Sequence, residues 1–293
     1  MAYVEAWKAV QDHTQGAETL AALGAIFGAR AGESTTNDAI AGKLDAVHQA
    51  IAPGMLSDIS TDEFRFLHAI VRANLRRALD LAESPHKPAG WSFNDPVIMQ
   101  AQGRASRLCT RLINSYAERN PTLRECLDNP GRFLDVGSGA GWISMSLAER
   151  WAKLNVDGID IFDPALALAN TNLASSTVKD RVTFSKRNVL ELQDRGTYAA
   201  AFLPIVFIPE QALRDVLATL SDAVRSQGWL FVTAFRIPAD PLAQALNDLQ
   251  TTLWGGRVWA EDEAIKMLVD SGFEFIEDIG RGTGIHLHAA RKP

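Results

Sequence analysis

The residues with the clearest chemical potential form a glycine-rich segment near the middle of the chain. Residues 133–142 read FLDVGSGAGW, in which an aspartate precedes glycines at positions 137, 139 and 141. Glycines at alternate positions let the backbone turn sharply and approach a ligand without a Cβ in the way. The first turn of a helix after such a loop presents free N–H groups. The segment therefore predicts a strand, a ligand-binding loop and the start of a helix.

The spacing of these glycines narrows the choice of ligand. The dinucleotide fingerprint GxGxxG needs a glycine at position 142, where this chain has Trp142, and the Gly-Lys-Ser/Thr ending of a phosphate-binding P-loop is absent. A second acid, Asp160, ends the next predicted strand, where a carboxylate can accept both hydroxyls of a ribose. Asp157, in mid-strand, and Asp163, which is expected to cap the next helix, are its rivals.

A residue that could act on an acceptor molecule is harder to assign. A hydroxyl or carbon nucleophile can require a general base. His86 lies in a loop from which it could swing over a pocket, and His68 lies on an apolar helix face, where a satisfied, partly buried histidine is the commoner outcome. His286 and His288 alternate on the last predicted strand and are expected to be structural or exposed. Arg236 follows the fifth strand and could pair with a substrate carboxylate or phosphate, or form a surface salt bridge.

These residues are positioned by a chain whose pattern changes at about residue 132. From there, short apolar runs alternate with amphipathic stretches, which is typical of βαβ units and a mostly parallel sheet. Strands are predicted at 132–136, 155–160, 182–186, 199–203, 229–234, 273–279 and 284–290, and helices at 142–152, 164–174, 210–224 and 261–271. We therefore expect an α/β fold with a Rossmann-like, doubly wound, seven-stranded sheet whose last strand is antiparallel.

The first third of the chain shows helical periodicity instead. Helices are predicted at 18–30, 37–51 and 61–83, with Thr61 as the N-terminal cap of the third. Two prolines and a glycine in residues 84–94 indicate a linker, and Asp95-Pro96 begins a further helix to about Glu118. The expected domains are a helical lid or dimerisation region over 1–94, with its linker at 84–94, and a core over 95–293.

The core resembles the class I methyltransferases that depend on S-adenosylmethionine (SAM). In that family an acid at the end of a strand precedes GxGxG, and the resemblance covers about residues 132–292. Residues 226–232, SQGWLFV, resemble the family's LxPGG-strand segment with Pro-Gly-Gly reduced to Ser-Gln-Gly. The resemblance implies SAM as cofactor and S-adenosylhomocysteine as product, with Asp135, Gly137, Ser138, Gly139, Gly141, Asp160, Ile161, Asn188, Val189 and Leu203 binding the cofactor.

One position departs from the family pattern. The loop after the third strand usually meets the adenine edge through an aspartate, and Asn188 stands there in this chain. An amide can both donate and accept hydrogen bonds, so it could still bind adenine. A turn-forming asparagine is the alternative.

Acceptor contacts should come from loops beyond the carboxyl ends of the strands. Family members that methylate the amino group of DNA adenine or of glutamine carry Asn/Asp-Pro-Pro-Tyr/Phe after the fourth strand. Residues 203–209 read LPIVFIP here, which counts against those acceptors and indicates an apolar pocket wall or a buried loop. The predicted acceptor contacts are Trp91, Met99, Gln102, Arg104, Phe207, Arg236 and Trp254.

Composition and charge count against several classes of function. A net charge of −6 over 293 residues argues against a dedicated nucleic-acid partner. The two cysteines, Cys109 and Cys126, form no CxxC pair, which suggests a reducing compartment and no metal site. Without a signal peptide or an apolar run of about 18 residues, we expect a cytoplasmic protein that does not associate with membranes.

We therefore expect a methyltransferase that acts on an oxygen, nitrogen, sulfur or carbon atom of a small molecule, and that forms a homodimer through its N-terminal helices. A SAM-binding scaffold or partner subunit without activity, or a methyltransferase acting on protein or RNA, are the alternatives. A nicotinamide oxidoreductase is disfavoured by Trp142.

Overall fold

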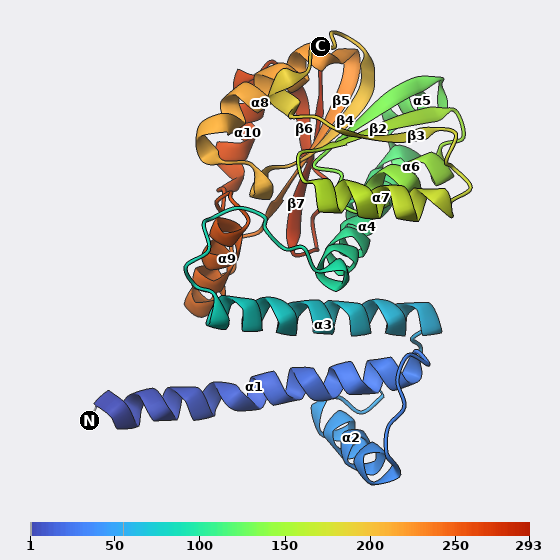
Figure 1. Ribbon diagram of the computed structural model, residues 1–293. Helices are drawn as coiled ribbons and strands as arrows, with labels where there is room; N and C mark the ends of the chain where they lie inside the picture. The colour runs from blue at the N-terminus through green and yellow to red at the C-terminus, as the bar shows by residue number, and fades with distance from the viewer. Residues whose placement is uncertain (1, 55) are drawn as a thin grey trace. The chain divides into compact units, whose positions relative to one another are not determined.

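The computed structural model describes residues 2–54 and 56–293, which separate into two compact units. The first unit holds the residues up to 87 together with 95–105, and the second holds 88–94 and 106–293. Figure 1 labels the elements of both units along the chain. The linker segment 88–94 thus belongs to the second unit, whereas the first turns of helix α4 (Pro96–Arg119) belong to the first.

The first unit is built from helices. Its core cluster comprises Ile26, Phe27, Ala31, Phe64 and Val71. These residues come from α1 (Ala2–Arg30), the turn after it, and α3 (Thr61–Glu83), and α2 (Asp38–Ile51) packs beside α1.

Two details of the first unit differ from the prediction. Helix α1 begins at Ala2 rather than at residue 18. Residues 2–18 are exposed, so the helix extends beyond the part that packs in the core of the first unit. The cap of α3 is Ser60 rather than Thr61. The Ser60 Oγ accepts from the Glu63 N–H at 3.3 Å, and the Glu63 carboxylate accepts from the Ser60 N–H at 2.9 Å. This reciprocal capping box requires the residue three positions before Glu63.

The second unit contains the predicted seven-stranded sheet, in the order β3-β2-β1-β4-β5-β7-β6. Six strands are parallel and β7 runs antiparallel to its neighbours β5 and β6, as predicted. The order reverses between β1 and β4, so a ligand crevice is expected at their carboxyl ends. The strands are β1 (Gly131–Val136), β2 (Leu154–Asp160), β3 (Val182–Lys186), β4 (Tyr198–Pro204), β5 (Val224–Phe235), β6 (Glu274–Asp278) and β7 (Ile285–Arg291).

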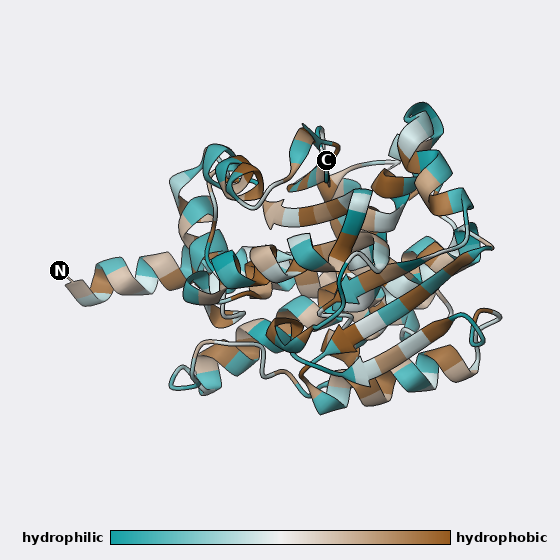
Figure 2. Cartoon of the chain, turned by 90° about the horizontal axis from the view of Figure 1, so that it is seen from above, coloured by the Kyte–Doolittle hydropathy of each residue, from teal (hydrophilic) through white to brown (hydrophobic). Residues whose placement is uncertain are grey.

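Helices cover both faces of this sheet, which explains why its central strand is apolar throughout. Every residue of β4 is buried, with Phe202 in the cluster on one face and Leu203 in the cluster on the other. Hydrophobic residues predominate along the strands in Figure 2. The helices of this unit are the rest of α4, α5 (Pro121–Asp128), α6 (Trp142–Arg150), α7 (Asp163–Ala174), α8 (Glu210–Ala223), α9 (Pro241–Leu253) and α10 (Glu261–Asp270), with 3₁₀ turns η1 (Val189–Glu191) and η2 (Ile205–Phe207).

Two further predictions need correction. Asp163 does not cap α7: the cap is Phe162, without a side-chain hydrogen bond, and the Asp163 carboxylate instead accepts from the Lys186 ammonium at 2.6 Å. Strand β5 begins at Val224 rather than at residue 229. Its pairing with β4 is irregular between Tyr198 and Ala200, so the apolar run marks only the regular part of the strand.

No helix in the described part of the chain is long and apolar enough to cross a membrane.

Candidate functional site

The glycine loop joins β1 to α6 at the carboxyl edge of the sheet. Gly137, Gly139 and Gly141 have φ angles of 66°, 55° and 81°, a region that favours glycine. A Cβ at Gly141 would lie 2.4 Å from the ring of Phe184, so glycine is required there for space as well. Helix α6 begins after Gly141 without a side-chain cap, which leaves first-turn N–H groups facing the loop.

Asp160 fixes the position of this loop. One oxygen of its carboxylate accepts from the Gly139 N–H at 2.9 Å, and the other accepts from the Phe162 N–H at 2.9 Å. Burial raises the pKa of the Asp160 carboxyl, and these backbone hydrogen bonds oppose the rise. Each oxygen keeps a further lone pair, so the carboxylate can also accept two hydroxyl groups of a ligand. Its rival Asp157 is committed to Arg132 and Thr183.

Asp135 lies fully buried beneath the same loop. Its Oδ2 accepts from the Ser144 hydroxyl at 2.5 Å, and its Oδ1 has no hydrogen-bond partner in the described part of the chain. Burial raises the pKa of Asp135 to about 7. The hydroxyl of Ser138 in the loop is also buried without a partner among the described residues. Unsatisfied buried polar atoms beside a loop call for an additional partner. Ser144 is not among the residues predicted from the sequence, although a hydroxyl in the first turn of α6 is a signal that could have pointed to it.

A group of aromatic rings lies beyond the ends of β4 and β5 in the second unit. Trp91, Phe207 and Trp254, three of the predicted acceptor contacts, come together there. The ring centroids of Phe207 and Trp254 are 4.8 Å apart in a stacked arrangement, and Trp91 lies edge-on to Phe207 at 5.6 Å. Phe93 packs on Trp91 at 5.3 Å, and Phe235 packs on Trp254 at 5.5 Å. We call these five residues the aromatic cluster.

Comparison with known proteins shows similarity to methyltransferases. A family model described as a methyltransferase domain matches residues 133–228. The release factor glutamine methyltransferase of Agrobacterium fabrum is 31% identical over 159 residues, which are 54% of this chain and 48% of that protein. The matching segments span less than half the length of the curated relatives.

Solved structures share the fold over most of the chain. Human N-acetylserotonin methyltransferase in complex with SAM superposes with a TM-score of 0.67 at 14% identity, covering 98% of both chains. An O-methyltransferase family protein from Burkholderia thailandensis superposes with a TM-score of 0.63 at 15% identity, covering 86% of this chain and 84% of that one. Residues 133–228 thus match a methyltransferase domain, and the fold is that of class I, SAM-dependent methyltransferases.

The human methyltransferase of this fold binds SAM, and the loop residues of this chain fit that cofactor. Asp160 has lone pairs left for the ribose hydroxyls, and the glycine backbone can approach the ligand closely. Ile161, which follows Asp160, and Leu190, in η1, are exposed apolar side chains. The Asn188 Oδ1 accepts from the Leu190 N–H at 3.0 Å and caps η1, which leaves its NH₂ group able to donate.

The predicted cofactor contacts Val189 and Leu203 lie in the buried core of the second unit. Both side chains are buried in the apolar cluster that packs beneath α8, together with Leu134 and Val232. Their side chains therefore fill the core below the site. Val189 comes shortly after β3, and Leu203 lies near the end of β4.

The remaining predicted site residues have other partners or lie in the first unit. Arg236 donates to the Asp278 carboxylate at 2.5 Å and to the Thr283 carbonyl at 3.1 Å, so its guanidinium is committed to the sheet edge. Met99, Gln102 and Arg104 belong to the first unit, where the Gln102 Oε1 accepts from Arg77 at 3.3 Å.

The candidate histidines likewise either lie in the first unit or have partners on the sheet. His68 pairs with Glu33 at 2.8 Å within the first unit, and His86 is exposed there. His286 and His288 are both buried on β7 rather than exposed, and their rings stack at 5.5 Å. The His286 Nδ1 lies 3.0 Å from Asp278. Burial acts to raise the pKa of Asp278, but hydrogen bonds from His286, backbone N–H groups and Arg236 lower it to about 2.

Proposed function

We propose that this methyltransferase transfers the methyl group of SAM to a small acceptor molecule that carries a flat, apolar ring. The observation that carries the proposal is the aromatic cluster, which gathers five rings from the linker, η2, the end of β5 and the end of α9. Aromatic side chains bind flat rings by stacking and edge-to-face contact. In a doubly wound sheet the carboxyl ends of the strands are where ligands bind.

The segment around the cluster is built for close packing. A Cβ at Gly256 would lie 2.3 Å from the Val206 carbonyl oxygen, and one at Gly255 would lie 3.1 Å from the Cα of Gly90. The Gly90 N–H also donates to the Leu253 carbonyl at 3.2 Å. The linker, η2 and the end of α9 are therefore held directly against one another, which supports a preformed wall for an acceptor.

The residues after β4 support a small molecule over a nucleic acid or a protein amide. Relatives by sequence are named for release factor glutamine and tRNA adenine, but their matches cover 21% to 54% of this chain. Leu203, Ile205 and Val206 are almost completely buried, so this loop offers no polar side chain for an amino group. A structural relative of nearly full coverage is named for N-acetylserotonin, a small molecule.

Bound SAM supplies an electrophilic methyl carbon, and such a reaction needs mainly an aligned acceptor. The aromatic cluster would orient the acceptor ring and exclude water. Within the described second unit, both histidines are buried in β7 against Asp278 or each other. We therefore propose alignment of the acceptor as the main contribution of the protein.

The test is transfer of label from methyl-labelled SAM. Purified protein is incubated with a panel of small phenols and indoles, with tRNA, and with a glutamine-containing peptide, beside a Trp254→Ala variant. We expect label in a small aromatic acceptor, with a KM at least tenfold higher for the variant while SAM affinity is unchanged. Label in tRNA or peptide alone would refute the small-molecule proposal. SAM binding without transfer until another protein is added would favour a partner subunit.

We also propose that two copies associate through α1. Tyr3, Val4, Trp7 and Val10 are 79%, 67%, 52% and 57% exposed, and their spacing places them along one side of the helix. An antiparallel pairing that opposes Tyr3 to Val10 of the other copy lets each copy bury the same residues.

A further inference from the structure

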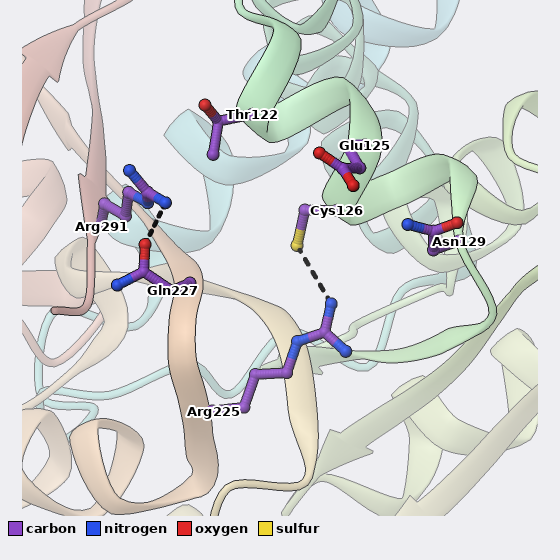
Figure 3. Close-up of a pocket in the computed structure, with 7 residues that line it drawn as sticks. All are labelled: Thr122, Glu125, Cys126, Asn129, Arg225, Gln227 and Arg291. Carbon is purple, nitrogen blue, oxygen red and sulfur yellow. Dashed lines mark hydrogen bonds between the residues drawn. The ribbon is translucent and has the colours of Figure 1, made fainter.

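A second pocket lies at the opposite edge of the sheet from the glycine loop. It involves the start of β5, the end of the antiparallel β7 and helix α5, which precedes β1, whereas the glycine loop follows the carboxyl end of β1. Figure 3 shows its lining residues. They are Thr122, Glu125, Cys126, Asn129, Arg225, Gln227 and Arg291.

Two guanidinium groups line this pocket without a carboxylate partner. Among the described residues, neither Arg225 nor Arg291 makes an ion pair. Among the described residues, the Arg225 guanidinium donates to the Sγ of Cys126, at 3.8 Å, which is a weak acceptor. Burial raises the pKa of the Cys126 thiol, so the sulfur stays neutral and does not compensate the charge.

Arg291 is also incompletely satisfied. One of its terminal nitrogens donates to the Gln227 Oε1, as Figure 3 shows, while its Nε is buried without a partner in the described part of the chain. Gln227 holds this contact from a left-handed backbone conformation, φ 62°, which residues other than glycine rarely adopt. Strained residues that hold a side chain in place are frequent at binding sites.

We propose that this pocket binds a phosphate group, either free phosphate or the phosphoryl end of a small metabolite. Arg225 and Arg291 would be its counter-ions, because guanidinium groups match the geometry and charge of phosphate oxygens. The amide of Asn129 and the hydroxyl of Thr122 line the same pocket and can also donate. Glu125 is the one acid in the lining, and its side chain is exposed.

The size of the pocket favours a small group. Its volume of about 220 Å³ is below the range of about 300–1,000 Å³ that drug-sized ligands occupy. A phosphate group fits this space. The site is separate from the proposed methyl transfer, since its residues lie at the other edge of the sheet.

The test is a titration of the full chain with inorganic phosphate and with glycerol 3-phosphate, followed by calorimetry and by the midpoint of thermal unfolding. Sodium chloride of equal ionic strength and sodium acetate are the comparison salts. Arg225→Gln and Arg291→Gln remove one guanidinium each. Arg214→Gln is the matched control, because Arg214 is exposed on α8 and does not line the pocket. No methyl donor or acceptor is present, so the outcome is independent of the proposed activity.

We expect saturable phosphate binding by the wild type and Arg214→Gln, weakened at least tenfold in each pocket variant. Tighter binding of glycerol 3-phosphate than of phosphate would identify a metabolite as the ligand. Gln227→Gly provides a variant that should fold at least as well, since it relieves the left-handed residue, yet bind phosphate more weakly. Equal responses to phosphate and chloride, or phosphate binding that survives in both arginine variants, would overturn the proposal.

Discussion

Asp135 is the residue whose protonation departs furthest from ordinary behaviour at neutral pH. Its pKa of about 7 in the folded chain lies well above the 3.8 of an exposed aspartate, because its carboxyl is fully buried. Between these values the unfolded chain binds fewer protons than the folded one. The free energy of unfolding therefore falls as pH rises from about 4 to about 7.

The substitution Asp135→Asn tests this linkage. Asparagine can still accept the Ser144 hydroxyl, but it does not ionise. The variant should gain stability relative to the wild type as pH rises from about 4 to about 7, and the difference should stay constant above about pH 8. Urea unfolding at pH 4.5, 6.0 and 8.0 measures it. A stability difference that does not change with pH would show that Asp135 is ionised throughout.

Asp160 carries the second prediction at this scale. Asp160→Ala removes the acceptor of the Gly139 and Phe162 N–H groups and of the ribose hydroxyls. SAM affinity should fall by about 1–3 kcal/mol, as expected for charged hydrogen bonds. Calorimetric titration with SAM and S-adenosylhomocysteine measures the loss. Asp163→Ala is the control, because its exposed carboxylate pairs only with Lys186 in the described residues, and an equal loss there would contradict the assignment.

At the scale of elements, the turn from β1 to α6 depends on backbone freedom. Gly141→Ala would force a Cβ into the Phe184 ring at 2.4 Å and into a φ of 81°. We expect a loss of about 2–4 kcal/mol in the free energy of unfolding, from overpacking and backbone strain together. Gly42→Ala is the control. It lies in helix α2 with open space around its Cβ, so alanine should add up to about 1 kcal/mol.

Denaturant unfolding of both variants checks this prediction. If the free energy of unfolding that Gly141→Ala loses is no larger in size than the change produced by Gly42→Ala, the loop can rearrange around Phe184. In that case the glycine loop would not be a rigid part of the site.

The sequence predicts the sheet well because parallel strands buried on both faces form continuous apolar runs, as in β4. It predicts no helix over 241–253, although Asp240-Pro241 repeats the cap signal of Asp95-Pro96. Leu242, Leu246 and Leu249 of α9 are exposed, although their spacing of four and three residues is that of an amphipathic helix. The cofactor loop can be predicted from the local spacing of its glycines. The aromatic cluster does not, because Trp91, Phe207 and Trp254 are brought together only by the fold.

At the scale of the whole molecule, the exposed stripe of α1 has consequences for assembly. Large apolar side chains on one side of a helix are stable in water when they are covered by another surface. Self-complementary stripes favour a two-fold pair, in which each copy buries the same residues. Tyr3 and Trp7 would contribute most of the buried area, because aromatic side chains dominate such interfaces.

We expect light scattering after size exclusion to give about twice the 31.9 kDa chain mass for the wild type. Trp7→Glu should shift the protein to the monomer at micromolar concentration, because it places a charge in the centre of the pair. Leu249→Glu is the matched control, since it makes the same kind of change on the exposed face of α9. If Trp7→Glu keeps the mass of the wild type, or if the wild type is a monomer at every concentration tested, then α1 does not join two copies. The helices of the first unit would in that case have a role within a single chain.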